Sequence, residues 1–103
     1  METIKRLPTH PGEVLKEELE VRKISQKHFA DCIGMSYTML NEILNGKRAV
    51  TNEFALIVEA ALGINPEVLM NLQNRYNMAQ ARMKPTMTVR LEQIRKVCAS
   101  WIL

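Results

Sequence analysis

Two short amphipathic segments joined by a glycine lie near the middle of the chain, in SQKHFADCIGMSYTMLNEILNGKR at residues 25–48. Each segment is too short to form a stable isolated helix in water, so the two must pack tightly on each other and on neighbouring helices. Ala30 allows a close helix crossing, Gly34 allows a sharp turn with positive φ, and Leu40 points back into the core. This spacing predicts a helix-turn-helix over about residues 25–45.

The exposed face of the second helix decides what such a unit can bind, because that helix lies in the DNA major groove in helix-turn-helix proteins. The side chains expected on this face carry hydroxyl and amide groups, which can read base edges, and one tyrosine ring. Basic residues flank the unit and would neutralise phosphates, and Gln26 could hold a phosphate or brace a base contact. The predicted DNA-binding residues are Gln26, Lys27, Ser36, Tyr37, Thr38, Asn41, Lys47 and Arg48. The alternative is a helical hairpin whose polar face is only solvated.

Helical patterns also fill the rest of the chain, so the sequence predicts an all-α fold. Five helices are expected from capping residues, prolines at first positions and terminating glycines. They cover about residues 11–22, 25–34, 36–45, 51–63 and 66–80. The cap of the fourth helix is expected at Thr51 or Asn52, and the fifth helix is expected to begin at Asn65-Pro66.

Pro85 marks a boundary between the body of the chain and a C-terminal tail. We therefore divide the sequence into an N-terminal arm at 1–9, a DNA-binding domain at 10–81 and a tail at 82–103. The tail carries a net charge of +4, whereas the whole chain carries +3, so the basic pI says little about the body. Apolar residues recur in the tail at the spacing of an amphipathic helix, although TMTV at 86–89 could form a strand. These apolar residues are Leu91, Ile94, Val97 or Cys98, and Trp101.

The sequence lacks the patterns of a catalytic or metal-binding site. There is no Ser/His/Asp set and no glycine-rich phosphate loop. Cys32 and Cys98 lie far apart, so two reduced thiols are expected, and no metal site is expected at His10 or His28. The apolar runs are too short to span a membrane, and the N-terminus has no signal-peptide core. We expect a cytoplasmic protein that is not an enzyme and uses no cofactor or metal.

Short motifs spread along the body resemble those of one known family. They are HPGE at 10–13, NEILNGKR at 41–48, LQ at 72–73 and YN at 76–77. Together they resemble the HigA/VapI-type antitoxins of the XRE (Cro/C1 phage-repressor-like) helix-turn-helix family, over about residues 10–80. The resemblance implies a five-helix, lambda-repressor-like domain that binds palindromic double-stranded operator DNA in its own promoter as a homodimer. It also implies a protein partner, a small ribonuclease toxin of the HigB type that cleaves messenger RNA on the ribosome.

Residue roles follow from the resemblance by position. One glutamine matches the family's backbone contact, four residues fall on base-reading positions, and two fall on the phosphate-contacting loop. The backbone contact is Gln26, the base-reading positions are Ser36, Tyr37, Thr38 and Asn41, and the loop residues are Lys47 and Arg48. Position 37 is often an arginine in this family, so Tyr37 removes a charge that would read guanine, and the operator should differ accordingly.

A two-fold dimer is also expected from the geometry of DNA, because one helix-turn-helix reads only a few base pairs and two copies read half-sites one turn apart. The predicted interface is the apolar face of the fifth helix, at Val68, Leu69, Leu72 and Tyr76. The same four residues could instead close the core of the monomer. The tail could pack on the dimer partner, dock the toxin, or act as a basic arm on DNA.

Three functions are compatible with these patterns. The first is an antitoxin that represses its own operon and neutralises its toxin. The second is a stand-alone repressor of phage or plasmid type, and the third is a protein-interaction module that no longer binds DNA. A neighbouring gene for a small basic protein would favour the first.

Overall fold

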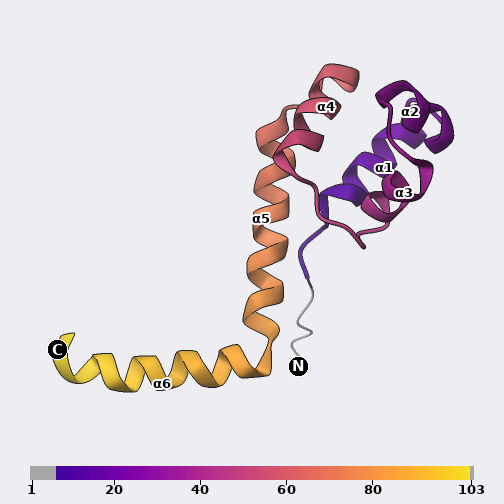
Figure 1. Cartoon of the computed structure of the whole chain (residues 1–103). Helices are drawn as coiled ribbons and strands as arrows, with labels where there is room; N and C mark the ends of the chain where they lie inside the picture. Colours follow the sequence, from indigo (N-terminus) through magenta and orange to yellow (C-terminus); the bar gives the residue numbers. More distant parts are fainter. Residues whose placement is uncertain (1–6, 103) are drawn as a thin grey trace, which may run out of the picture.

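The computed structural model describes residues 7–102, and over this range the chain forms six α-helices and no strand (Figure 1). The helices are α1 Pro11–Val21, α2 Gln26–Ile33, α3 Tyr37–Leu44, α4 Asn52–Leu62, α5 Pro66–Met83 and α6 Pro85–Ile102. The predicted all-α fold is confirmed, with the helix-turn-helix formed by α2 and α3. Residues 1–6 of the predicted arm and Leu103 of the tail lie outside the described residues.

The strand signal at 86–89 was wrong, because these residues form the first turns of α6. Pro85 has a fixed φ that suits the first position of a helix. The amides of Met87 and Thr88 then donate to the carbonyl oxygen of Lys84 at 3.0 and 3.1 Å. These bonds start a helical turn, so the backbone groups of this segment pair within the helix and not with a neighbouring strand.

Side-chain caps fix where the helices begin. Three hydroxyls accept the backbone N–H three residues ahead, at 3.1, 3.1 and 3.2 Å, and they belong to Ser25, Ser36 and Thr51. The Asn65 side chain accepts from the Glu67 amide at 2.9 Å, so the predicted start of α5 is confirmed, and of the two caps expected for α4 the structure uses Thr51. α1 is capped by a residue that sequence reasoning did not select, since His10 Nδ1 accepts from the Gly12 amide at 2.9 Å.

The core lies among the first five helices and consists of aliphatic side chains with two phenylalanines. Its buried apolar residues are Leu15, Leu19, Phe29, Ala30, Leu40, Ile43, Leu44, Val50, Phe54, Ala55, Val58 and Leu69. Ala30 and Leu40 are 1% and 0% exposed, and Gly34 ends α2 in the left-handed conformation with φ of 69°. The packing roles predicted for these three residues are therefore confirmed.

The start of α1 touches the end of α3 so closely that no side chain fits between them. A methyl group added at Gly12 would overlap the carbonyl oxygen of Ile43 and lie 2.9 Å from His10 Nδ1. This contact fixes the end of α3 against α1, and so helps to set the orientation of the second helix of the helix-turn-helix.

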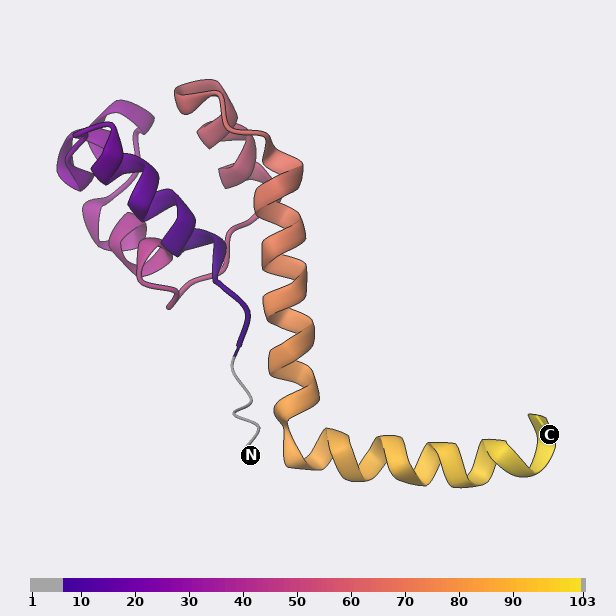
Figure 2. The same cartoon turned by 180° about the vertical axis from the view of Figure 1, so that it is seen from behind.

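α5 and α6 meet at a sharp bend, which we call the elbow, at Lys84 (Figures 1 and 2). Lys84 has φ of −71° and ψ of 123°, an extended conformation, because the ring of Pro85 disfavours helical geometry in the residue before it. α5 reaches Met83 rather than Gln80, and α6 then extends away from the body. The radius of gyration is 18.1 Å, whereas a compact chain of this length would have about 13 Å. Neither α6 nor any other described helix is long and apolar enough to cross a membrane.

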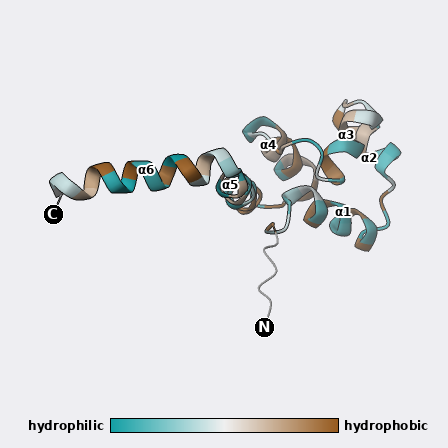
Figure 3. Ribbon diagram, turned by 90° about the horizontal axis from the view of Figure 1, so that it is seen from below, coloured by the Kyte–Doolittle hydropathy of each residue, from teal (hydrophilic) through white to brown (hydrophobic). Residues whose placement is uncertain are grey.

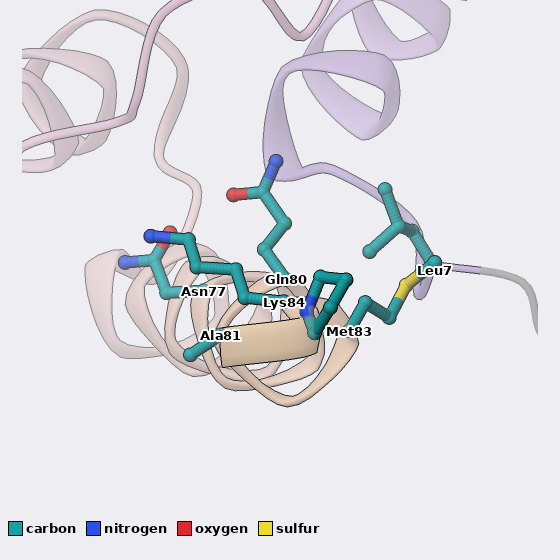
Figure 4. A pocket seen from close by; sticks show the side chains of 7 residues that line it. Leu7, Asn77, Gln80, Ala81, Met83 and Lys84 are labelled. Atoms are coloured by element: carbon teal, nitrogen blue, oxygen red, sulfur yellow. The ribbon is translucent and has the colours of Figure 1, made fainter. Parts of the chain in front are cut away.

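A hollow of about 720 Å³ lies in the angle between the N-terminal arm and the end of α5 (Figure 4). Its lining residues are Leu7, Asn77, Gln80, Ala81, Met83, Lys84 and Pro85. Leu7 and Met83 give it an apolar side, and the remaining long side chains are polar. The hollow therefore belongs to the arm and the elbow and not to the helix-turn-helix.

Candidate DNA-binding site

The first turn of α3 is open to solvent. Ser36 accepts from the Met39 amide at 3.1 Å, so its hydroxyl serves as the helix cap. Tyr37 is 51% exposed and Thr38 is also exposed, which leaves both side chains free to reach a ligand. The free N–H groups of this turn and the positive end of the helix dipole also suit a phosphate.

A chain of side-chain hydrogen bonds links three helices behind this turn. Asn41 Nδ2 donates to Gln26 Oε1 at 2.9 Å, and Asn45 Nδ2 donates to Asn41 Oδ1 at 3.1 Å. Lys16 Nζ on α1 donates to Asn45 Oδ1 at 3.2 Å. Both ends of the Asn41 amide are therefore engaged, and its first effect is to hold Gln26. Among the described residues the amide nitrogen of Gln26 has no hydrogen-bond partner, so it can donate to a phosphate.

Basic side chains lie on both sides of the exposed turn of α3. Lys27 is exposed on the first turn of α2, and Lys47 is exposed on the loop after α3. Arg48 contacts Glu42 through Nη2 and Oε1 at 3.3 Å, with both side chains more than a third exposed. Such a surface pair is weak, so Arg48 can exchange Glu42 for a phosphate at small cost.

Two buried polar residues lie behind the loop after α3, and the sequence named them only as members of the motifs LQ and HPGE, without a role. Gln73 of α5 accepts from the Val50 amide at 2.7 Å and donates to Asn77 at 2.9 Å. His10 is 2% exposed and lies edge-on to the ring of Tyr76, with centroids 4.8 Å apart. Burial lowers the pKa of His10 below its ordinary value because the charged ring would lose water, although the nearby Glu13 acts in the opposite direction. A buried glutamine on a long amphipathic helix leaves no periodic signal by which it could have been found.

The residues predicted as a dimer interface have unequal positions. Leu69 is 1% exposed and lies in the core of this chain, and Tyr76 is half-buried against His10. Val68 is 50% exposed and Leu72 is half-buried, so these two retain surface for a partner.

These features together define a helix-turn-helix DNA-binding protein. They are the capped pair of helices joined at a glycine, the exposed polar turn and the basic side chains that flank it. A family model described as helix-turn-helix matches residues 15–69. Antitoxin HigA-1 of Vibrio cholerae serotype O1 is 35% identical over an alignment that covers 90% of this chain and 96% of that protein.

Solved structures agree with this comparison. An addiction module antidote protein of the HigA family from Coxiella burnetii has a TM-score of 0.72 and 34% identity, over 84% of this chain and 96% of that chain. The protein PA4674 of Pseudomonas aeruginosa, in complex with its 18-base-pair operator DNA, has a TM-score of 0.73 and 28% identity, over 86% of this chain and 94% of that chain. The present chain belongs to the XRE-type helix-turn-helix family and, within it, to the HigA-type antitoxins.

Proposed function

We propose that this protein is the antitoxin of a type II toxin–antitoxin operon, which represses that operon as a dimer and neutralises a HigB-type ribonuclease in the cytoplasm. Repression and neutralisation are complementary, because a repressor that also binds the toxin can link the level of free toxin to transcription of the operon that encodes both proteins. The observation that carries the DNA-binding half of this proposal is the exposed turn of α3, with Gln26 held beside it by Asn41 at 2.9 Å.

On operator DNA, the first turn of α3 would enter the major groove. Tyr37 and Thr38 would contact base edges or a thymine methyl group, while Ser36 and Asn41 would hold the turn in shape. Gln26, Lys27, Lys47 and Arg48 would contact phosphates, which set the register of the protein on the duplex. PA4674, which was solved with operator DNA, supports this assignment through its similar fold.

Dimerisation would use the outer face of α5. Val68 and Leu72 are four residues apart, so they lie on one side of the helix, and Ala79 continues that side with a small residue. Two copies packed along this face would present two α3 helices to successive half-sites of a palindrome.

The test has two readouts on the same protein. Footprinting on the promoter of its own gene should show two protected half-sites about one helical turn apart. In growing cells, co-expression should reverse the growth arrest caused by the toxin from the neighbouring gene. Thr38→Ala should lose protection and keep growth rescue, while Val21→Ala, at a 77% exposed position on α1, should keep both.

Each failure has its own meaning. Protection of the promoter without growth rescue would replace the antitoxin with a stand-alone repressor. Growth rescue without protection would leave a protein-interaction module. Absence of both would refute the proposed function.

A further inference from the structure

α6 carries an apolar stripe, and beyond the elbow no other helix of the described residues 7–102 packs on it. The stripe residues follow one another at intervals of four, three, four and three, and are Met87, Leu91, Ile94, Cys98 and Trp101. This is the spacing at which one helix packs lengthwise against another. Ile94 is 45% exposed and Trp101 is 72% exposed, and Figure 3 shows the hydrophobic colour recurring along α6 beside open space.

α6 cannot draw its stability from its own sequence. It contains Thr86, Thr88, Val89, Ile94 and Val97, which are β-branched and lower helix propensity. Its packing on the body is confined to the elbow with α5, and within its described part no side chain is buried. An isolated 18-residue helix of this composition is only marginally stable in water, so burial of the stripe against a partner would supply the missing stability.

Charge argues against pairing of α6 with a second α6. Arg90 and Arg95 flank the stripe on its two sides and are five residues apart. In a parallel helix pair this interval places each arginine beside the other helix's arginine. Parallel pairing of two α6 helices would therefore set like charges together on both flanks.

A groove of matching character lies between α4 and the start of α5, with a volume of about 450 Å³. Its lining residues are Asn52, Ala55, Leu56, Pro66, Glu67, Met70 and Asn71. Leu56 is 56% exposed, so the groove offers apolar surface to a partner. Glu67 stands on the α5 wall, and Glu59 lies one turn beyond Ala55 and Leu56 on the same face of α4. Residues 52–71 contain three glutamates and no lysine or arginine.

We propose that α6 of one copy packs into the groove between α4 and α5 of a second copy, with Arg90 and Arg95 facing Glu59 and Glu67. This helix exchange rests on the dimer of the proposed function and extends it, because Val68 adjoins the groove. The groove of the same chain is out of reach, since it lies at the first turns of α5, roughly 20 Å along the helix from the elbow. Pro85 also directs α6 away from it. Exchange in both directions gives a closed two-fold dimer.

Thiol cross-linking between two chains tests the position of α6. One chain carries Cys32→Ser and keeps Cys98, and the other carries Cys32→Ser, Cys98→Ser and Leu56→Cys. A short bismaleimide should join the two chains in a mixture. The matched control replaces Leu56→Cys with Val21→Cys, which is more exposed and lies on α1, and it should give no product above background.

Two cross-linking results would overturn the proposal. A Cys98–Cys98 product from the first chain alone would show α6 paired with α6. If Leu56→Cys cross-linked to a co-purified toxin and not to Cys98 of the second copy, the occupant of the groove would be the toxin and not α6.

Charge reversal tests the recognition independently. Arg90→Glu with Arg95→Glu should weaken dimerisation by roughly tenfold, because a dimer holds four exposed pairs and each contributes about a factor of two. Glu59→Lys with Glu67→Lys should weaken it similarly, and the combined chain should recover. Lys96→Glu, on the side of α6 opposite the stripe, is the control. Dimer dissociation is measured by sedimentation, and helix content by circular dichroism.

Unchanged dimerisation in both reversed chains would overturn the helix exchange and leave the proposed function intact if they still protect the promoter. Failure of the parent chain both to protect its promoter and to rescue growth would refute the proposed function, and the cross-linking result would still decide where α6 binds.

Discussion

Asn41→Ala removes the side chain that joins Gln26 to Asn45. Two hydrogen bonds disappear, at 2.9 and 3.1 Å, one part-buried and one exposed. Net contributions of about 0.5–1.5 kcal/mol for each bond give a loss of about 1–2 kcal/mol in the free energy of unfolding, with the exposed bond at the lower end.

The larger effect should fall on DNA binding. Without Asn41, the Gln26 side chain is free in the unbound protein and must be ordered on the operator, which costs up to about 1.5 kcal/mol. Affinity for the operator should therefore fall measurably, by up to about tenfold. Since no charge is lost, the slope of log affinity against log salt should stay the same.

Fluorescence anisotropy with labelled operator at several salt concentrations measures both quantities, and thermal unfolding measures stability. Asn74→Ala, an exposed position on α5, is the matched control and should change neither. If Asn41→Ala bound the operator as tightly as the parent while losing stability, Gln26 would not need to be held and the assigned role of the network would be wrong.

Four further predictions concern single positions. Thr38→Ala should weaken operator binding by about 1–3 kcal/mol and leave binding to random DNA unchanged, and equal affinity for the operator would remove α3 from base reading. Lys47→Ala should weaken binding to all sequences and lower the salt slope by about one ion, in a titration against Lys96→Ala. Gln73→Leu leaves the buried Val50 amide without its acceptor and should destabilise the fold by about 1–3 kcal/mol in urea unfolding. Because burial lowers the folded-state pKa of His10, the unfolded state binds the proton more tightly. Stability should therefore be full above the unfolded pKa of about 6.5 and decline as the pH falls below it. His10→Asn, which retains a capping acceptor, should flatten this decline in melting curves, and an unchanged decline would assign it to other groups.

Sequence reasoning succeeded where a local rule decides the structure. The caps at Ser25, Ser36 and Thr51 follow from local sequence, because each hydroxyl bonds an amide only three residues ahead. Gly34 and Gly63 end α2 and α4 with positive φ for an equally local reason.

The features that escaped sequence reasoning depend on residues far apart in the chain. The network from Lys16 to Gln26 joins three helices, and its register follows only from how those helices cross. His10 is an uncommon cap, and its selection follows from burial against Tyr76. Periodicity placed Val68 and Leu69 on one apolar face, but only packing decides that Leu69 enters the core and Val68 does not.

The buried apolar residues of the core all lie between Leu15 and Leu69, so no side chain of α6 contributes to the core of the monomer. Substitutions on α6 therefore leave the stability of the helix-turn-helix almost untouched. Mutations can accumulate there without loss of the fold, and selection acts on α6 only through whatever it touches. Two related copies in one cell could thus diverge in α6 and cease to mix, while each keeps the same means of reading DNA.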